Sequence, residues 1–169
     1  MTNSLMRSVV LVVTGLSCLW LTATATAVAP EIRDHGKFFS AEAIKKADER
    51  IAEISRKYDR DLLIETFASV PEGDVDKVKA MDAKERSQYF VAWAKDRAHK
   101  RAVNGVYVLV CKEPRYLQVG VDEREPHKFP QGTRAAVEEA VKKEFKEGRF
   151  DAGLDEAIKV VEERLAKSK

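Results

Sequence analysis

The stretch from Asn104 to Val121, NGVYVLVCKEPRYLQVGV, decides the fold. Its first half, Val106 to Cys111, is almost wholly apolar and rich in β-branched and aromatic residues, which is typical of a strand buried on both faces. In the second half Tyr116 and Gln118 alternate with aliphatic residues, as in a strand with one wetter face. The short link between the halves suits an antiparallel hairpin. We therefore expect this hairpin in the middle of a sheet that helices cover.

Helical patterns flank the hairpin on both sides. Ser40 is expected to cap a helix in which apolar residues recur at spacings of three and four as far as Tyr58. A second helix is expected from about Ala83 to His99. Beyond the hairpin, Thr133 and Asp151 are expected to cap two further helices.

Two other segments are expected to join the sheet. Leu62 to Phe67 has the apolar character of a largely buried strand, and Ile32 to Gly36 is an extended segment that could add a strand beside the hairpin. The prediction is an α/β fold in which a small mixed β-sheet has α-helices packed on both faces, as a three-layer sandwich.

The N-terminus has the features of a secretory signal peptide. Arg7 precedes an apolar run from Val9 to Trp20, and small residues follow it. Cleavage after Ala27 would give a signal peptide over residues 1–27 and one domain over residues 28–169; cleavage after Ala29 also fits the pattern. The alternatives are an uncleaved anchor and a lipoprotein signal at Cys18, although the apolar run is short for a membrane span.

Export would place the mature protein in the periplasm or outside the cell, with no membrane span after signal cleavage. The 30 basic and 28 acidic residues give a formal charge of +2, so nothing in the charge balance indicates a nucleic-acid partner. Cys111 would be the single cysteine left after cleavage, and we expect it to be a small buried apolar residue.

Carboxylates at the expected strand ends are the first candidates for chemistry. The sequence contains no glycine-rich phosphate loop, no CxxC, no HExxH and no GxSxG motif. The carboxylates at or near strand ends are Asp34, Asp61, Asp122, Glu123 and Glu125. Calcium and magnesium prefer oxygen ligands of this kind. We therefore predict a divalent-cation site formed by Asp34 with Asp122 or Glu123.

Basic residues supply the candidates for binding phosphate or another anion. A group of them precedes the central strand and includes Lys95, Arg97 and Arg101, while Arg115 lies in the expected hairpin turn. The structural interpretation is a solvated helix end whose cations complement the helix dipole. The functional interpretation is that Arg101 or Arg115 contacts a phosphate group.

The order of several motifs resembles that of the TPM domain family. These motifs are Ile32 to Ser40, Asn104 to Val110, Tyr116 to Gly120 and Phe145 to Leu154. The resemblance covers about Ile32 to Leu165, and it implies an α/β sandwich located outside the cytoplasm or in a plastid lumen. It also implies divalent-cation binding, with Asp34 as the acidic residue that matches directly.

The family resemblance leaves two functions open. Its members include a thylakoid-lumen protein of photosystem II repair with acid phosphatase activity, and others that resemble binding or assembly factors. The first hypothesis is an exported accessory module that binds an unknown envelope protein or a small phosphorylated ligand, with calcium or magnesium. The second is a metal-assisted phosphatase acting on phosphate monoesters. We favour binding because no nucleophile or base is recognisable in the sequence.

Overall fold

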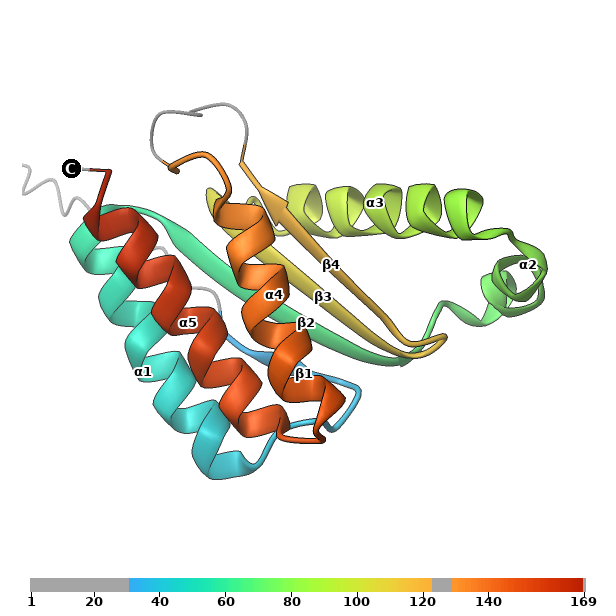
Figure 1. The fold of residues 1–169 in the computed structure, drawn as a ribbon, viewed down its shortest axis with the longest axis horizontal. Coiled ribbons are helices and arrows are strands. Elements are labelled where there is room, and N and C mark those ends of the chain that lie inside the picture. The colour runs from blue at the N-terminus through green and yellow to red at the C-terminus, as the bar shows by residue number, and fades with distance from the viewer. Residues whose placement is uncertain (1–30, 123–128, 169) are drawn as a thin grey trace, which may run out of the picture.

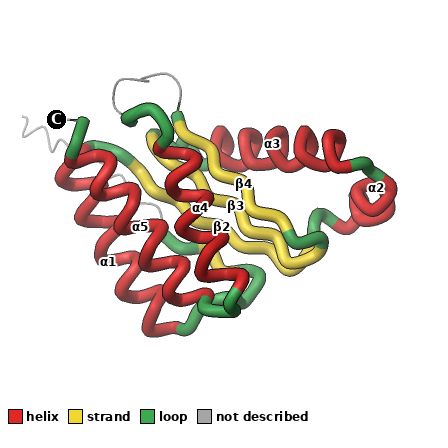
Figure 2. Tube along the Cα trace, in the orientation of Figure 1, coloured by secondary structure: helices red, strands yellow, loops and turns green. Residues whose placement is uncertain are grey.

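The computed structural model describes residues 31–122 and 129–168. Its elements in chain order are β1 (Arg33–Asp34), α1 (Ala41–Tyr58), β2 (Asp61–Ser69), η1 (Glu72–Asp74), α2 (Val75–Ala80), α3 (Ala83–Lys100), β3 (Gly105–Glu113), β4 (Tyr116–Val121), α4 (Thr133–Lys146) and α5 (Phe150–Ala166). The strands form one sheet in the order β1-β2-β3-β4, in which β4 is antiparallel to β3 and the other pairs are parallel. Helices α1, α4 and α5 cover one face and α3 lies on the other (Figures 1 and 2). The predicted α/β sandwich is confirmed.

Strand β3 is buried from Gly105 to Cys111 because each of its faces lies in a separate core. Val106, Val108 and Val110 pack with α1, α4 and α5, whereas Tyr107 and Leu109 pack with α3. Successive side chains of a strand point to opposite faces, so a strand covered on both sides is apolar at most positions. The expectation of a buried strand here is confirmed.

The hairpin does not lie in the middle of the sheet, because β4 is an edge strand. The expectation of a wetter face on β4 is also wrong. Gln118 is buried, and its amide nitrogen donates to the carbonyl oxygen of Val119 at 3.0 Å. The ring of Tyr116 stacks on Phe90 of α3 with a centroid separation of 4.0 Å. Helix α3 therefore covers the face that alternation suggested was open to solvent.

A close approach of two chain segments explains the Asn104–Gly105 pair. The backbone amide of Asn104 donates to the Asp61 carboxylate at 2.8 Å, and the Asp61 amide donates to the Asn104 carbonyl at 3.0 Å. A Cβ atom on Gly105 would lie 2.0 Å from the Asp61 carbonyl oxygen. Only glycine fits this position, so Asp61 has a structural role at the start of β2.

Three expectations about helix caps have different outcomes. Ser40 caps α1 as predicted, with its side chain accepting from the Ala43 amide at 3.1 Å. Thr133 is instead the first residue of α4, and its hydroxyl donates to the Pro130 carbonyl at 2.7 Å. Asp151 lies inside α5, where its carboxylate accepts from the Ser40 amide at 2.9 Å. Asp151 therefore connects α5 to the start of α1, which its position in sequence does not reveal, whereas the Thr133 bond is local.

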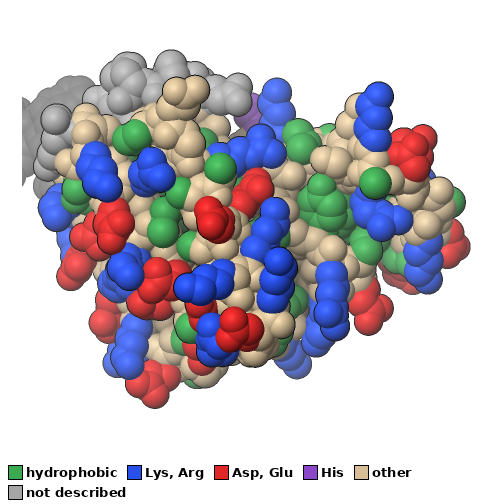
Figure 3. All heavy atoms as spheres, in the orientation of Figure 1, with side chains coloured by type: hydrophobic (Ala, Val, Ile, Leu, Met, Phe, Trp, Pro, Cys, Tyr) green, Lys and Arg blue, Asp and Glu red, His purple; other side chains and the backbone are tan. Residues whose placement is uncertain are grey.

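The outer surface of α1, α4 and α5 carries interspersed charges of both signs (Figure 3). Ion pairs join many of them, including Arg50 with Asp155 and Lys142 with Glu138 at 3.2 Å. Such exposed pairs contribute little stability but leave no strong field of one sign on this face. Among the described residues, none of the helices has the length and apolar character needed to cross a bilayer. The expected signal peptide lies outside the described residues.

Candidate functional site

The Asp34 carboxylate organises the turn that leads into α1. It accepts hydrogen bonds from the amides of Phe38 at 3.0 Å and Phe39 at 2.9 Å, and from the Thr66 hydroxyl at 2.5 Å. The Thr66 oxygen in turn accepts from the Gly36 amide at 2.9 Å. Both carboxylate oxygens of Asp34 are therefore used inside the fold.

The structure does not bring Asp34 and Asp122 together. Strand β1 adds to β2 rather than to the hairpin, and Asp34 pairs with Thr66. The Asp122 amide donates to the Gly105 carbonyl at 2.8 Å, beside the start of β2. The two aspartates lie at opposite edges of the sheet and about 16 Å apart along the strands, at about 3.3 Å per residue. The predicted cation site shared by these two residues is not formed, and Glu123 lies outside the described residues.

The two arginines predicted to bind phosphate also lie far apart. Arg101 follows α3 and precedes the start of β3, whereas Arg115 is exposed in the turn at the other end of the β3–β4 hairpin. No single phosphate group can contact both. Only Arg101 belongs to a larger group of charges.

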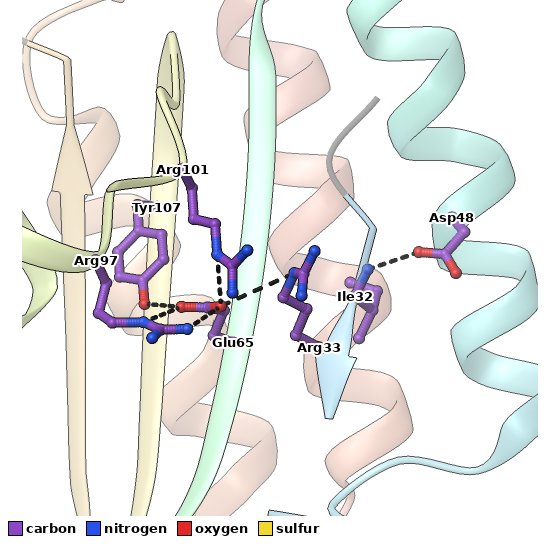
Figure 4. A network of polar contacts seen from close by, with 7 residues as sticks. All are labelled: Ile32, Arg33, Asp48, Glu65, Arg97, Arg101 and Tyr107. Atoms are coloured by element: carbon purple, nitrogen blue, oxygen red, sulfur yellow. Dashed lines mark hydrogen bonds and ion pairs between the residues drawn. The ribbon is translucent and has the colours of Figure 1, made fainter. Parts of the chain in front are cut away.

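That group surrounds Glu65 in the middle of β2 (Figure 4). The Glu65 side chain is 0% exposed and points to the face of the sheet on which α3 lies. Arg97 donates to it through Nε at 2.8 Å and Nη2 at 2.6 Å, and the Tyr107 hydroxyl donates at 2.6 Å. A buried carboxylate held by a two-pronged guanidinium and a phenol is fixed in position.

Two further arginines share the same carboxylate. The Nε atoms of Arg101 and Arg33 lie 3.7 Å and 4.0 Å from Glu65 Oε1. Their side chains are 37% and 41% exposed, compared with 23% for Arg97. Three guanidinium groups against one carboxylate leave two positive charges in excess. We call Arg33, Arg97 and Arg101 the arginine cluster.

Protonation states in the cluster follow from these contacts. Burial tends to raise the pKa of Glu65, but the hydrogen bonds from Arg97 and Tyr107 and the charges of Arg97 and Arg101 together hold it below its ordinary value. Burial and the hydrogen bond to Glu65 raise the pKa of the Tyr107 phenol. At neutral pH the carboxylate is therefore ionised and the phenol keeps its proton.

Register and helical spacing bring the cluster together. Arg33 of β1 is the direct partner of Glu65 in the parallel β1–β2 pair, so their side chains share a face. Arg97 and Arg101 are four residues apart, which places them on one side of the end of α3. The arginines near the end of α3 are candidates from the sequence alone, whereas Glu65 is not among the predicted site residues.

Other candidate residues have simpler surroundings. Cys111 is buried, and burial raises the pKa of its thiol to about 11. Within residues 31–122 and 129–168, no three His, Cys, Asp or Glu side chains gather as a metal-binding group. A surface hollow of about 390 Å³ lies between α1 and α5, away from the arginine cluster, and its lining includes Ser40, Lys46, Asp151 and Asp155. Asp151 is bonded there to the Ser40 amide.

Comparison with known protein families gives one match. The model of the family described as the TPM domain matches residues 32–164 of this chain. A comparison with curated proteins gives no match.

Solved structures with a similar fold come from three bacteria. The N-terminal domain of a P. gingivalis protein has a TM-score of 0.64 at 13% identity, covering 85% of this chain and 86% of that chain. The N-terminal domain of cg2496 from Corynebacterium glutamicum has a TM-score of 0.60 at 10% identity, with coverages of 88% and 86%. The BA42 protein of Bizionia argentinensis has a TM-score of 0.56 at 20% identity, with coverages of 78% and 84%. At these identities the likeness concerns the fold alone.

Proposed function

Because this chain belongs to the TPM domain family, we propose that it is an exported binding module that holds an anionic group of its ligand at the arginine cluster. The observation that carries the proposal is the excess of positive charge around Glu65. Arg97 satisfies the carboxylate with two hydrogen bonds, whereas Arg33 and Arg101 only approach it through Nε. In the described part of the chain, no hydrogen bond engages the terminal nitrogens of Arg33 or Arg101.

Glu65 would prepare these two arginines for an anion. Guanidinium groups bind phosphate and carboxylate oxygens through paired N–H donors, and less freedom is lost on binding when their position is already restricted. Both side chains are partly exposed, so an anion can reach them without unfolding the sheet. The Glu65 charge keeps them close to each other despite their mutual repulsion.

A phosphatase is the alternative, and the groups beside the cluster favour binding over covalent catalysis. The Tyr107 hydroxyl is bonded to Glu65 and its pKa is raised, so it is a poor nucleophile at neutral pH. The Cys111 thiol is buried, with a pKa of about 11. Release of inorganic phosphate from a phosphate monoester, measured with calcium, magnesium or chelator, would support the phosphatase instead.

A divalent cation is a separate part of the proposal. Since the fold already uses both Asp34 oxygens, the better candidates for calcium or magnesium are Asp122 and its neighbour Glu123. Calorimetric titration of each cation into wild type, Asp34→Ala and Asp122→Ala tests this assignment. Loss of binding in Asp122→Ala with retention in Asp34→Ala is expected. No binding by wild type would remove the cation from the account.

Export rests on the N-terminal sequence alone. N-terminal sequencing of the protein recovered from the periplasm or medium is expected to give a chain that begins at Val28. A chain that keeps Met1 and fractionates with membranes would contradict export.

Calorimetric titration of inorganic phosphate into the purified protein tests the anion site. Binding is expected at low ionic strength and should weaken as salt is added. Arg33→Gln and Arg101→Gln should each weaken it about tenfold or more, as for a charge-assisted hydrogen bond of about 1.5 kcal/mol or more. Arg115→Gln is the matched control and should bind like wild type. A loss of binding in Arg115→Gln alone would place the anion at the hairpin turn.

A further inference from the structure

A row of aromatic side chains lies next to the arginine cluster on the same face of the sheet. Phe67 of β2 contacts the His35 ring at a centroid distance of 5.8 Å and the Trp93 ring of α3 at 4.7 Å. The Arg97 guanidinium carbon lies 5.3 Å from the Phe67 ring centroid. Arg97 thus joins the charged and the aromatic groups.

Strand geometry sets the spacing between these two rows. Residues two apart on a strand point to the same face, so Phe67 follows Glu65 along β2 at a step of about 7 Å. Arg33 is the direct partner of Glu65 in the β1–β2 pair, and His35, in the turn that follows β1, places its ring against Phe67. The arginine cluster and the aromatic side chains of Phe67 and His35 therefore lie side by side, at β2 and at the end of β1.

Solvent reaches the aromatic row from the β1 side. Helix α3 packs against β3 and β4, where Phe90 is fully buried. Nearer to β1, His35 is exposed and Phe67 and Trp93 are only half-buried. Partly exposed rings beside partly exposed cations can contact a ligand with a flat apolar part and an anionic part.

We infer that the arginine cluster and the aromatic row form one site for a phosphate monoester that carries a planar ring on a short spacer, as a nucleoside monophosphate does. Arg33 and Arg101 hold the phosphate, and the ring packs against Phe67 and His35. This inference rests on the proposed anion site and adds the class of ligand to it. The step of about 7 Å from Glu65 to Phe67 along β2 favours a spacer between phosphate and ring over direct attachment.

Calorimetric titrations with four probes test the inference: inorganic phosphate, ribose 5-phosphate, adenosine and adenosine 5′-monophosphate. The monophosphate is expected to bind about tenfold more tightly than ribose 5-phosphate, because stacking on an aromatic side chain is worth about that factor. Adenosine alone should bind far more weakly than the monophosphate. Equal affinities for the monophosphate and ribose 5-phosphate would reject the proposed contact of the ring with Phe67 and His35. The same result would leave the proposed anion site unaffected. Failure of all the phosphates would reject both.

Substitutions separate the two parts of the site. Phe67→Leu and His35→Ala should each reduce the advantage of the monophosphate and leave binding of inorganic phosphate unchanged. His35 is exposed, so His35→Ala gives a result even if Phe67→Leu disturbs the core. Phe150→Leu is the matched control, since Phe150 packs with Phe38 and Phe145 away from the arginine cluster. An undiminished advantage in both test variants, with wild-type melting temperatures, would overturn the inference.

Discussion

Arg97 holds Glu65 through two hydrogen bonds, Nε to Oε2 at 2.8 Å and Nη2 to Oε1 at 2.6 Å, although the residues are 32 positions apart in sequence. The pair joins the end of α3 to the middle of β2. The carboxylate is fully buried and the Arg97 guanidinium is partly exposed. The buried charge of Glu65 therefore holds arginine side chains at the protein surface.

Glu65→Gln removes the charge that three arginines share. The arginines would then repel one another without compensation, and we expect the free energy of unfolding to fall by about 3 kcal/mol. Urea denaturation measures the change. Glu42→Gln is the matched control, because Glu42 pairs with Lys46 on an exposed helix surface and should leave stability unchanged. Equal stability of Glu65→Gln and wild type would show that the cluster does not depend on the carboxylate.

The lowered pKa of Glu65 predicts a loss of stability in acid. A carboxylate with a lower pKa in the folded state contributes stability above its unfolded pKa of about 4.3, and this contribution disappears as the pH falls through the folded value. Urea denaturation from about pH 6 to about pH 2 spans the unfolded pKa of a glutamate. The free energy of unfolding should fall below about pH 4. The fall should be shallower in Glu65→Gln, and parallel curves for the two proteins would contradict the assignment.

Asp34→Ala should destabilise the turn before α1. The substitution leaves the Phe38 and Phe39 amides and the Thr66 hydroxyl without their acceptor, so we expect a loss of about 2 kcal/mol. The loss should be the same in calcium and in chelator, as measured by urea denaturation. Glu49→Ala on the exposed side of α1 serves as the control. A loss of stability that appears only in calcium would show that Asp34 is a ligand of the cation.

Gly105→Ala should be strongly destabilising because the new Cβ would overlap the backbone of Asp61. We expect a loss of about 3 kcal/mol or more, since backbone on both sides must move. Gly73→Ala is the matched control, as nothing lies within 4 Å of a Cβ built there. Thermal unfolding of the two variants compares them directly. Similar melting temperatures would show that β2 and β3 can move apart at Gly105 without loss of stability.

Local patterns in the sequence predict the elements of this fold well. Val106 to Val110 reads as a strand buried on both faces, and its side chains do enter two cores. The position of β4 at the edge could not be predicted in this way, because strand order depends on which parallel connections form. Gln118 reads as a solvent-facing residue, yet α3 covers it; tertiary packing overrides the alternation.

The candidate site was much harder to predict than the fold. Arg101 was predicted from its own charge, but its connection to Glu65 depends on the placement of α3 against β2. A signal was present, since Glu65 is a charged residue inside an otherwise apolar strand, where a buried carboxylate requires partners. Its partners Arg97 and Tyr107 are 32 and 42 positions away, so spacing alone could not identify them.

The most direct measurement of the central claim is a phosphate titration followed through the guanidinium Nε–H signals of the arginines by NMR. Arg33 and Arg101 should shift together and give one common dissociation constant, while exposed Arg115 at the other end of β3 should not shift. Absence of any shift at Arg33 and Arg101, or a saturable shift at Arg115 alone, would contradict an anion site at the arginine cluster.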